Sequence, residues 1–449
     1  MVLVAVVAAM QEPRALLLLP AVALGVLFVR FAALRIIVFI GGALLVFQTS
    51  EGITLPKVAY LALVALAVGL ALVRLPRILR AAWGQEMRLA VIGSGLLAAW
   101  VILVTLPYSV AVEGVPVSAW ARDAITYLLI SAGVLIAIEA AATSSLKQVR
   151  ILALGTGSVV AIGFSARWVG LRGFGGAEAS QTLLASFVGV SFPLALAFAL
   201  ALVGPRIRPH YAFLGVFFLV ALLVTGTRTA AVFGVVFLGL VGSHRKLRAG
   251  VFRVVAGVGS AALAVVLLLP LAGATFSSEQ FISQRFDAGV QALTGGLTQD
   301  RSGAIRARAY EFAADIWRDH VLMGQGLGRV FPDPSVAGFT TSFSLDTPLS
   351  YPAKFGLIGT IVLVGCLALV ARALLRRGAH GYTVESTAFR GTVVVVLALL
   401  PFGAPTEDKG FALTVALAVL CVAVAKREAS LVPVSSSHQK QPMALRHDI

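Results

Sequence analysis

The feature that most constrains this chain is a succession of apolar runs, each long enough to cross a lipid bilayer. A helix of about 20 apolar residues spans the hydrocarbon core. Because lipid offers no partners to backbone amides, each run must satisfy its own hydrogen bonds as a helix. Hydrophobic residues make up 59% of the 449 residues and charged residues only 12%, which is more apolar surface than a soluble domain can bury. The sequence therefore predicts an all-α, multi-pass membrane protein.

The apolar runs predict about 12–13 transmembrane helices. The count stays open because the first two spans are short and are separated by Arg30 and Arg35. The segment Met1–Met10 is apolar but lacks a basic start, so no separate cleavable signal peptide is expected. The predicted spans are 15–31, 34–48, 56–74, 88–107, 124–142, 149–165, 182–203, 211–226, 228–243, 251–272, 353–375, 389–403 and 410–425.

The basic residues predict the orientation of these helices. The formal net charge is +16, which on a soluble protein would favour nucleic acid as a partner. Here Lys and Arg gather in alternate short loops, so we interpret them as topology signals and expect no nucleic-acid partner. These loops and the C-terminal tail are then expected to be cytoplasmic. The preference for Ala, Val, Gly and Arg over Lys and Asn is typical of a GC-rich bacterium, so the inner membrane of a bacterium is the expected location. The basic stretches are 74–88, 147–150, 206–208, 245–253, 372–390 and 426–427.

The remaining loops are predicted to face outward, and only one is long enough to form a subdomain. These loops are 49–55, 108–123, 166–181, 226–228, 273–352 and 404–409. The chain is therefore expected to have four parts. They are an N-terminal transmembrane bundle (1–272), a large helical extracytoplasmic loop (273–352), C-terminal transmembrane helices (353–429) and a polar, disordered cytoplasmic tail (430–449).

Arg228 is the first candidate binding residue. It lies in a tight outward turn between two apolar runs, directly after Thr227, which would cap the next helix. An arginine in the first helical turn lies beside free amides and the positive end of the macrodipole, an arrangement that favours a nearby phosphate. The sequence leaves equally open an arginine that extends to lipid headgroups.

The segment 302–319 predicts an amphipathic helix in the large outer loop. Arg306 borders its apolar face together with Tyr310 and Trp317, and no carboxylate lies one turn away from it. Such an arginine needs a partner from elsewhere in the chain, or a ligand. The apolar face consists of Ile305, Ala309, Phe312 and Ile316, and the solvated face of Arg308, Glu311, Asp315 and Arg318.

Two further features follow this helix. The glycine turn, Gly324-Gln325-Gly326-Leu327-Gly328, is predicted to end the helix and reverse the chain tightly. A dinucleotide-binding loop is excluded because no βαβ unit surrounds it. Asp346 is an acid just before the span at 353, either a general base or a residue that shapes the turn.

Arg167 and Arg172 add two more outward cations, in the loop 166–181. Several arginines with one carboxylate suit a phosphate-bearing substrate and a general base. The six histidines are scattered, and both cysteines, Cys366 and Cys421, lie in apolar runs. We therefore expect no metal site, no disulfide and no cofactor.

At these residues the chain resembles the O-antigen ligase and polymerase superfamily of bacterial polysaccharide enzymes. Arg306-x3-Tyr310, continuing through His320 to the glycine turn, is similar to that family's outer-loop signature. The segment 355–359, Phe-Gly-Leu-Ile-Gly, is similar to the motif that opens the family's next span, and Arg228 to its arginine at the outer end of a middle helix. The similar motifs lie between 225 and 360.

The resemblance implies an all-helical membrane glycosyltransferase fold of the GT-C type. It implies that a glycan is transferred, on the outer face, from an undecaprenyl-pyrophosphate-type carrier to an acceptor sugar hydroxyl. Arg228 and Arg306, which match the family's arginines, would hold the pyrophosphate, and Arg167 and Arg172 are expected to join them because they lie in an outward loop. The implied partners are the polyprenyl-linked donor, a glycan or glycolipid acceptor and the lipid bilayer.

The sequence departs from the family at the residue that activates the acceptor. The family keeps a histidine shortly before the motif at 355–359, where this chain has Leu345-Asp346, and Val321 replaces the usual proline of the turn. This disfavours a lipid-A-core ligase and favours a polymerase, or a ligase to another acceptor. Asp346 is then the expected base, with His320 and Asp333 as the alternatives.

Two other function classes stay open. A transporter of a lipid-linked or anionic solute usually has charged or broken-helix features near the bilayer midplane, whereas most of these spans lack charges at mid-depth. A non-catalytic membrane protein of envelope assembly is compatible with the missing histidine.

Overall fold

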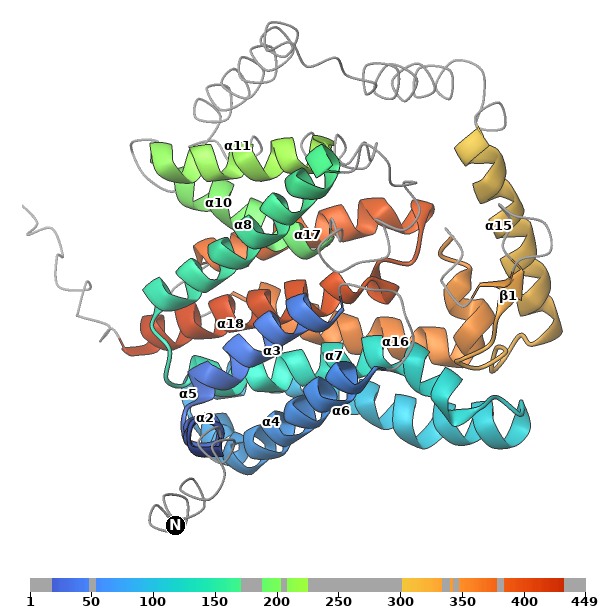
Figure 1. Ribbon diagram of the computed structural model, residues 1–449, viewed down its shortest axis with the longest axis horizontal. Helices are drawn as coiled ribbons and strands as arrows, with labels where there is room; N and C mark the ends of the chain where they lie inside the picture. Colours follow the sequence, from blue (N-terminus) through green and yellow to red (C-terminus); the bar gives the residue numbers. More distant parts are fainter. Residues whose placement is uncertain are drawn as a thin grey trace, which may run out of the picture.

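The structure is a computed structural model, and it describes residues 18–47, 54–170, 188–202, 208–224, 301–332, 340–341, 347–377 and 383–431. Helices form almost all of this part of the chain (Figure 1). The α-helices are α2 (Leu18–Arg30), α3 (Ala32–Val46), α4 (Leu55–Arg80), α5 (Ala82–Glu86), α6 (Arg88–Ala99), α7 (Val117–Ala141), α8 (Leu146–Gly170), α10 (Val188–Leu202), α11 (Pro209–Val224), α15 (Arg301–Asp319), α16 (Ser350–Leu375), α17 (Val384–Leu399) and α18 (Lys409–Leu431).

Shorter elements join these helices. They are the π-helices η2 (Trp100–Thr105) and η3 (Tyr108–Val112), the 3-10 helices η5 (Leu400–Phe402) and η6 (Pro405–Glu407), and two strands, β1 (Phe331–Pro332) and β2 (Thr340–Thr341). The two strands pair antiparallel, Phe331 with Thr341.

Six of the described helices are long and apolar enough to cross a membrane. The bent pair α2 and α3, which meets at an angle of 110°, would add a seventh if it forms one span. These helices confirm the prediction of an all-α membrane protein. The predicted spans 228–243 and 251–272 lie outside the described residues. The six helices are Leu55–Arg80, Arg88–Val112, Val117–Ala141, Leu146–Gly163, Ser350–Leu375 and Gly410–Leu431.

The predicted outward loop 108–123 is wrong in its extent. The helix that begins at Arg88 continues through η2 and η3 to Val112, and α7 begins at Val117, so only Glu113–Pro116 separates them. Pro107 lies between η2 and η3, as the residue before η3, and it has no amide hydrogen to donate to the helix.

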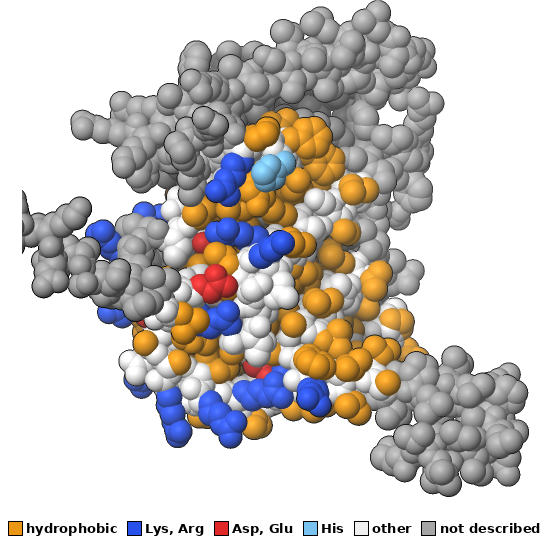
Figure 2. Space-filling view, turned by 90° about the vertical axis from the view of Figure 1, so that its left-hand side faces the viewer, with side chains coloured by type: hydrophobic (Ala, Val, Ile, Leu, Met, Phe, Trp, Pro, Cys, Tyr) orange, Lys and Arg blue, Asp and Glu red, His pale blue; other side chains and the backbone are white. Residues whose placement is uncertain are grey.

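Basic side chains gather at one end of the bundle, which we call the basic end. Figure 2 shows this face, formed where α2, α5 and the C-terminal end of α18 lie. Arg77 and Arg80 lie in the last turn of α4, and Arg372 in the last turn of α16. The opposite end carries α15 and β1 (Figure 1), and we call it the α15 end.

A buried ion pair fixes the bend between α2 and α3 at the basic end. Arg35 is 0% exposed and bonds Glu139 of α7 through Nε at 2.9 Å, while its Nη1 donates to the carbonyl of Phe28 at 2.6 Å. Arg74 of α4 also reaches Glu139, at 3.0 Å. One carboxylate therefore holds three helices and the last turn of α2 together.

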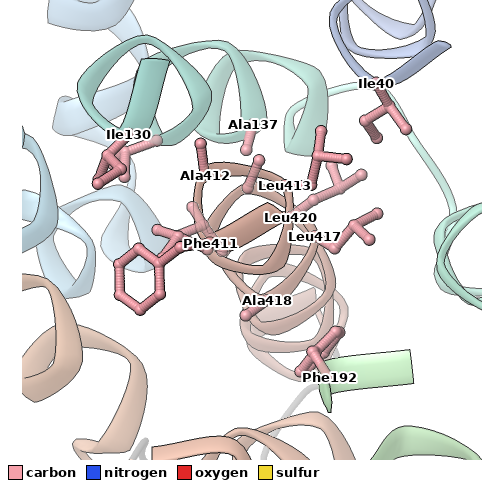
Figure 3. Close-up of a cluster of buried hydrophobic side chains, with 14 of the residues drawn as sticks. Ile40, Ile130, Ala137, Phe192, Phe411, Ala412, Leu413, Leu417, Ala418 and Leu420 are labelled. Atoms are coloured by element: carbon pink, nitrogen blue, oxygen red, sulfur yellow. The ribbon is translucent and has the colours of Figure 1, made fainter. Parts of the chain in front are cut away.

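The helices α7 and α18 form the centre of the bundle. Figure 3 shows Leu413, Leu417 and Leu420 of α18 packed among side chains of α3, α7 and α10. Gly133 allows the two central helices to approach, since a Cβ atom there would lie 3.0 Å from Cβ of Ala416. By contrast, α4, α6 and α16 expose apolar side chains on the outside of the bundle, as expected for helices that face lipid.

Candidate functional site

The amphipathic helix α15 packs against the start of α16. Its buried face is made of small residues at helical spacing, Ala309 and Ala313, together with Ile316, and these contact Ala353 of α16. Phe312 is 39% exposed, which corrects its predicted place on the buried face. The buried strip follows positions i, i+4 and i+7, which leaves Phe312 at its edge.

The exposed face of α15 agrees with the sequence. Arg318 and Asp315 form an ion pair of 2.8 Å with both side chains largely exposed. Such a pair adds little stability, because water screens both charges. It therefore marks a solvated surface and no binding site.

The glycine turn after α15 uses each of its own amides inside the protein. The amides of Gln325 and Gly326 donate to the carbonyls of Ala353 and Lys354, at 2.8 and 3.0 Å. The next two donate to side chains: Leu327 to Oγ of Ser109 and Gly328 to Oδ2 of Asp123, both at 2.9 Å. The amide of Gly324 donates to the carbonyl of His320 at 2.9 Å. Because each of these amides already has an acceptor inside the protein, none is left to bind a phosphate. The turn therefore has a structural role.

The glycines are required at this turn by conformation and by space. Gly324, Gly326 and Gly328 have φ values of 67°, 81° and 91°, a region that other residues rarely adopt. A Cβ atom on Gly326 would lie 2.6 Å from Oγ of Ser109, and one on Gly328 2.5 Å from the amide of Trp120. The predicted tight turn at these glycines is confirmed, while the helix itself ends earlier, at Asp319.

Helix α16 is broken where the turn meets it. Gly356 has φ 64° and ψ −173°, which interrupts the helix six residues after Ser350. The segment before the glycine turn supplies the missing partners: the amides of Leu357 and Ile358 donate to the carbonyls of Val321 and Leu322, at 2.9 and 3.2 Å. The turn and the break are thus one hydrogen-bonded unit.

A buried ion pair lies beside this break. Nζ of Lys354 donates to both carboxylate oxygens of Glu407, at 2.9 and 2.8 Å. Tyr127 of α7 donates its hydroxyl to the same carboxylate at 3.1 Å, and its ring meets the edge of Phe355 at 5.0 Å between centroids. This arrangement satisfies the buried charges and joins α7, α16 and η6.

The segment between α17 and α18 is held by two further tyrosines. The hydroxyl of Tyr351 accepts from Oγ1 of Thr406 at 2.8 Å, and Tyr310 of α15 donates to the carbonyl of Pro401 at 2.7 Å. Helix α15 is therefore attached to the bundle through the glycine turn and through this segment, in addition to its packing on α16.

A second polar group lies where η3 meets α7. Arg329, directly after the glycine turn, forms an ion pair with Glu113, and the hydroxyl of Tyr108 lies 3.0 Å from both Oε1 of Glu113 and the carbonyl oxygen of Gly324, where its one hydrogen can bond to either. Asp123 pairs with Arg122 at 3.1 Å while it accepts from the glycine turn. The turn is thus enclosed by polar groups on the α6–α7 side as well.

The structure describes the predicted site residues only in part. Arg228, Arg172 and Asp346 lie outside the described residues. Arg167 lies on α8 and Arg306 on α15, but only their backbones belong to the described part. These four arginines and Asp346 therefore stay predictions.

His320 lies at the end of α15. Its amide donates to the carbonyl of Trp317 at 3.1 Å and its own carbonyl accepts from Gly324, so its backbone belongs to the turn that ends the helix. Its side chain is half-buried. This position is that of a helix-terminal residue, and the role of His320 as a base stays a prediction.

The sequence interpretation missed the residues of the polar cluster around Lys354 and Glu407. Two signals were present in the sequence: Lys354 is the one charge that directly precedes the motif at 355–359, and Glu407 lies in the outward loop 404–409. Within the described residues, no group of three or more His, Cys, Asp or Glu is placed to hold a metal ion. A comparison with known protein families and with curated proteins finds no match to this chain.

Proposed function

We propose that this chain is an extracytoplasmic polysaccharide polymerase or ligase. It transfers a glycan from an undecaprenyl-pyrophosphate-type carrier to an acceptor sugar hydroxyl, at the α15 end of the bundle. In this proposal the α15 end faces away from the cytoplasm, because the basic end gathers the charges that the positive-inside rule retains there.

One observation carries the proposal. The two segments in which the sequence resembles the glycosyltransferase superfamily, the turn 320–328 and the motif 355–359, are joined by direct backbone hydrogen bonds. Hydropathy alone does not predict that these two segments contact each other. These hydrogen bonds hold α15, which carries Arg306, next to the first turns of the spanning helix α16.

The proposed chemistry needs few groups. Glycan transfer from a pyrophosphate carrier breaks the bond between the anomeric carbon and the phosphate oxygen, and forms one from that carbon to the acceptor hydroxyl. Arg228 and Arg306 would stabilise the charge that develops on the leaving pyrophosphate. Asp346, or His320 in its place, would take the acceptor proton. The polar cluster of Lys354 and Glu407 would keep α15 in position, because it joins the break in α16 to the segment between α17 and α18, and both contact α15 or the turn after it.

A transporter is the second candidate, because α16 is broken next to a buried ion pair. Such features serve transport when they lie near the bilayer midplane. Here the break is about 9 Å from the start of α16 at 1.5 Å per residue, in a hydrocarbon core of about 30 Å. No charged residue occurs in α7 between Asp123 and Glu139, or in α18 between Lys409 and Lys426. The charges therefore favour chemistry at the membrane surface.

The test is transfer by the purified chain in nanodiscs, with undecaprenyl-pyrophosphate-linked oligosaccharides extracted from the bacterium that encodes it. The wild type should lengthen or transfer the glycan. Asp346→Asn should lower the rate by about 100-fold or more, the usual contribution of a general base. His320→Asn tests the alternative base and should remain near wild type if Asp346 takes the proton. If the wild type releases or moves the intact lipid-linked glycan and forms no new glycosidic bond, the transporter reading replaces the enzyme.

A further inference from the structure

Two apolar side chains project from the chain directly after the charged helix α15. Val321 is 45% and Leu322 61% exposed, although both belong to the hydrogen-bonded unit that docks on α16. The carbonyls of both residues accept hydrogen bonds from α16, so the segment that carries these exposed side chains is held in place. Within the described residues no side chain covers this pair, and an apolar side chain that is exposed and well held is suited to contact with lipid.

The exposed pair continues the outer surface of α16. The amides of Leu357 and Ile358 donate to the carbonyls of Val321 and Leu322, which puts the two segments side by side. On α16 the exposed fractions are 44% at Leu357 and 62% at Ile361. Because α16 crosses the membrane, this surface faces acyl chains, and the same apolar surface extends onto the turn.

A polar boundary lies next to this surface. Arg318 and Asp319 of α15 are exposed immediately before the pair in sequence, and Trp317 donates its indole hydrogen to the carbonyl of Val321 at 3.1 Å. Tryptophan is typical of the boundary between acyl chains and headgroups. Charged residues, an indole and two exposed aliphatic side chains thus follow one another within six residues of sequence, 317–322.

We propose that Val321 and Leu322 insert into the acyl-chain boundary of the leaflet at the α15 end. The occupant of this surface is the bilayer itself. Helix α15 is then held at headgroup depth, which puts the polar cluster of Lys354 and Glu407 beside the phosphate layer. This contact depends only on the membrane-spanning position of α16, and it holds whether or not the chain transfers glycans.

Size and continuity favour lipid over a protein partner. A stable protein interface buries about 800 Å² on each side, which two aliphatic side chains do not supply. The spanning surface of α16 is already covered by lipid, so no separate recognition event is needed to cover its continuation. A second copy of the chain or another protein would have to displace lipid from both.

The experiment measures how deep in the bilayer a nitroxide spin label lies when it is attached to Leu322→Cys in nanodiscs. Collisions with oxygen, which concentrates in acyl chains, are compared with collisions with a water-soluble nickel chelate. Ile361→Cys is the lipid-facing reference, and Glu311→Cys, on the exposed face of α15, is the aqueous reference. The native Cys366 and Cys421 are buried, so the unaltered chain treated with the label is the blank.

The label at Leu322 should give an oxygen-to-nickel ratio close to that at Ile361 and several-fold above that at Glu311. A ratio equal to that at Glu311 would put the turn in water and overturn the proposal. Low collision rates with both reagents would also overturn it, because they would show that protein covers this surface. If Leu322→Cys lowers the yield of folded protein, Val321→Cys offers the same measurement one residue away.

Discussion

Nζ of Lys354 lies 2.8 Å from Oε2 and 2.9 Å from Oε1 of Glu407, and this ammonium and carboxylate are only 3% and 13% exposed. The pair joins the first turn and a half of α16 to the segment before α18. It lies one residue from Phe355 and two from the break at Gly356. Any change of the pair therefore acts on the unit that holds α15.

Loss of one partner should destabilise the protein more than loss of an exposed pair. Lys354→Met leaves the Glu407 carboxylate buried without its cation, and the free energy of unfolding should fall by about 3–5 kcal/mol. The matched control, Arg318→Met, breaks an exposed pair and should cost at most about 1 kcal/mol. Thermal unfolding in detergent measures both. Equal melting temperatures for the two variants would contradict a structural role for the buried pair.

The glycines of the turn should not tolerate a methyl group. Gly326→Ala would have to adopt φ near 81° with its Cβ 2.6 Å from Oγ of Ser109, and backbone strain of this kind costs about 1–3 kcal/mol. Gly95→Ala, on α6, is the control, since nothing lies within 4 Å of the added Cβ. We expect the melting temperature to fall for Gly326→Ala and not to fall for Gly95→Ala. An unchanged melting temperature for Gly326→Ala would show that the turn accommodates the added methyl group without strain.

The sequence predicted those parts of the fold that hydropathy and local conformation determine. Apolar runs located the spans, and three glycines spaced two apart located the turn after Asp319. The helical continuation to Val112 was missed because Pro107, Tyr108 and Ser109 are typical of loops. In the structure the proline sits in a π-helical stretch, while Tyr108 and Ser109 bond to the glycine turn more than 200 residues later in the chain.

The sequence did not predict which residues pair in the polar cluster, for a related reason. Lys354 and Glu407 are 53 residues apart in sequence, and Tyr127 is 280 residues from Glu407. Each is a single polar residue at the edge of an apolar run, where it is equally typical of a topology anchor or of a helix end. Only the packing of α7, α16 and α18 brings the three together. A periodicity argument contains no information on which helix ends meet.

The orientation of the bundle can be tested on residues at its two ends. A cysteine introduced at Glu311, on the exposed face of α15, should react with a membrane-impermeant maleimide added to intact spheroplasts. A cysteine at Arg80, in the last turn of α4, should react only after the membrane is opened. The reason is that the basic end is expected to be cytoplasmic. The opposite labelling pattern would contradict the predicted orientation, and with it the proposal that the reaction takes place on the outer face.

The last prediction separates Arg306 from Arg308, which lies two residues further along α15. Arg308 is exposed, and the sequence assigns it to the solvated face with Glu311 and Asp315. Arg306 has no carboxylate one turn away, so we expect it to be available for an anionic ligand. Arg306→Ala should lower glycan transfer by about 100-fold, in the range expected when a donor to a developing charge is removed. Arg308→Ala should leave transfer near the wild-type rate.

Both variants make the same change two residues apart on one helix, so their intrinsic helix propensities are matched, and thermal unfolding of each variant shows whether folding differs. Arg306→Lys refines the test, because an ammonium reproduces the charge but not the two parallel hydrogen bonds of a guanidinium. It should restore little activity if the pyrophosphate is held by both nitrogens, and most of it if only the charge matters. Transfer rates are measured in nanodiscs with the lipid-linked donor above saturation and again well below it. Arg306→Ala should lose activity in both conditions, since a contact made in the transition state lowers kcat as well as kcat/KM. If Arg306→Ala and Arg308→Ala lose activity equally, α15 matters only as a helix, and the arginine that holds the pyrophosphate has to be sought at Arg228 or Arg167.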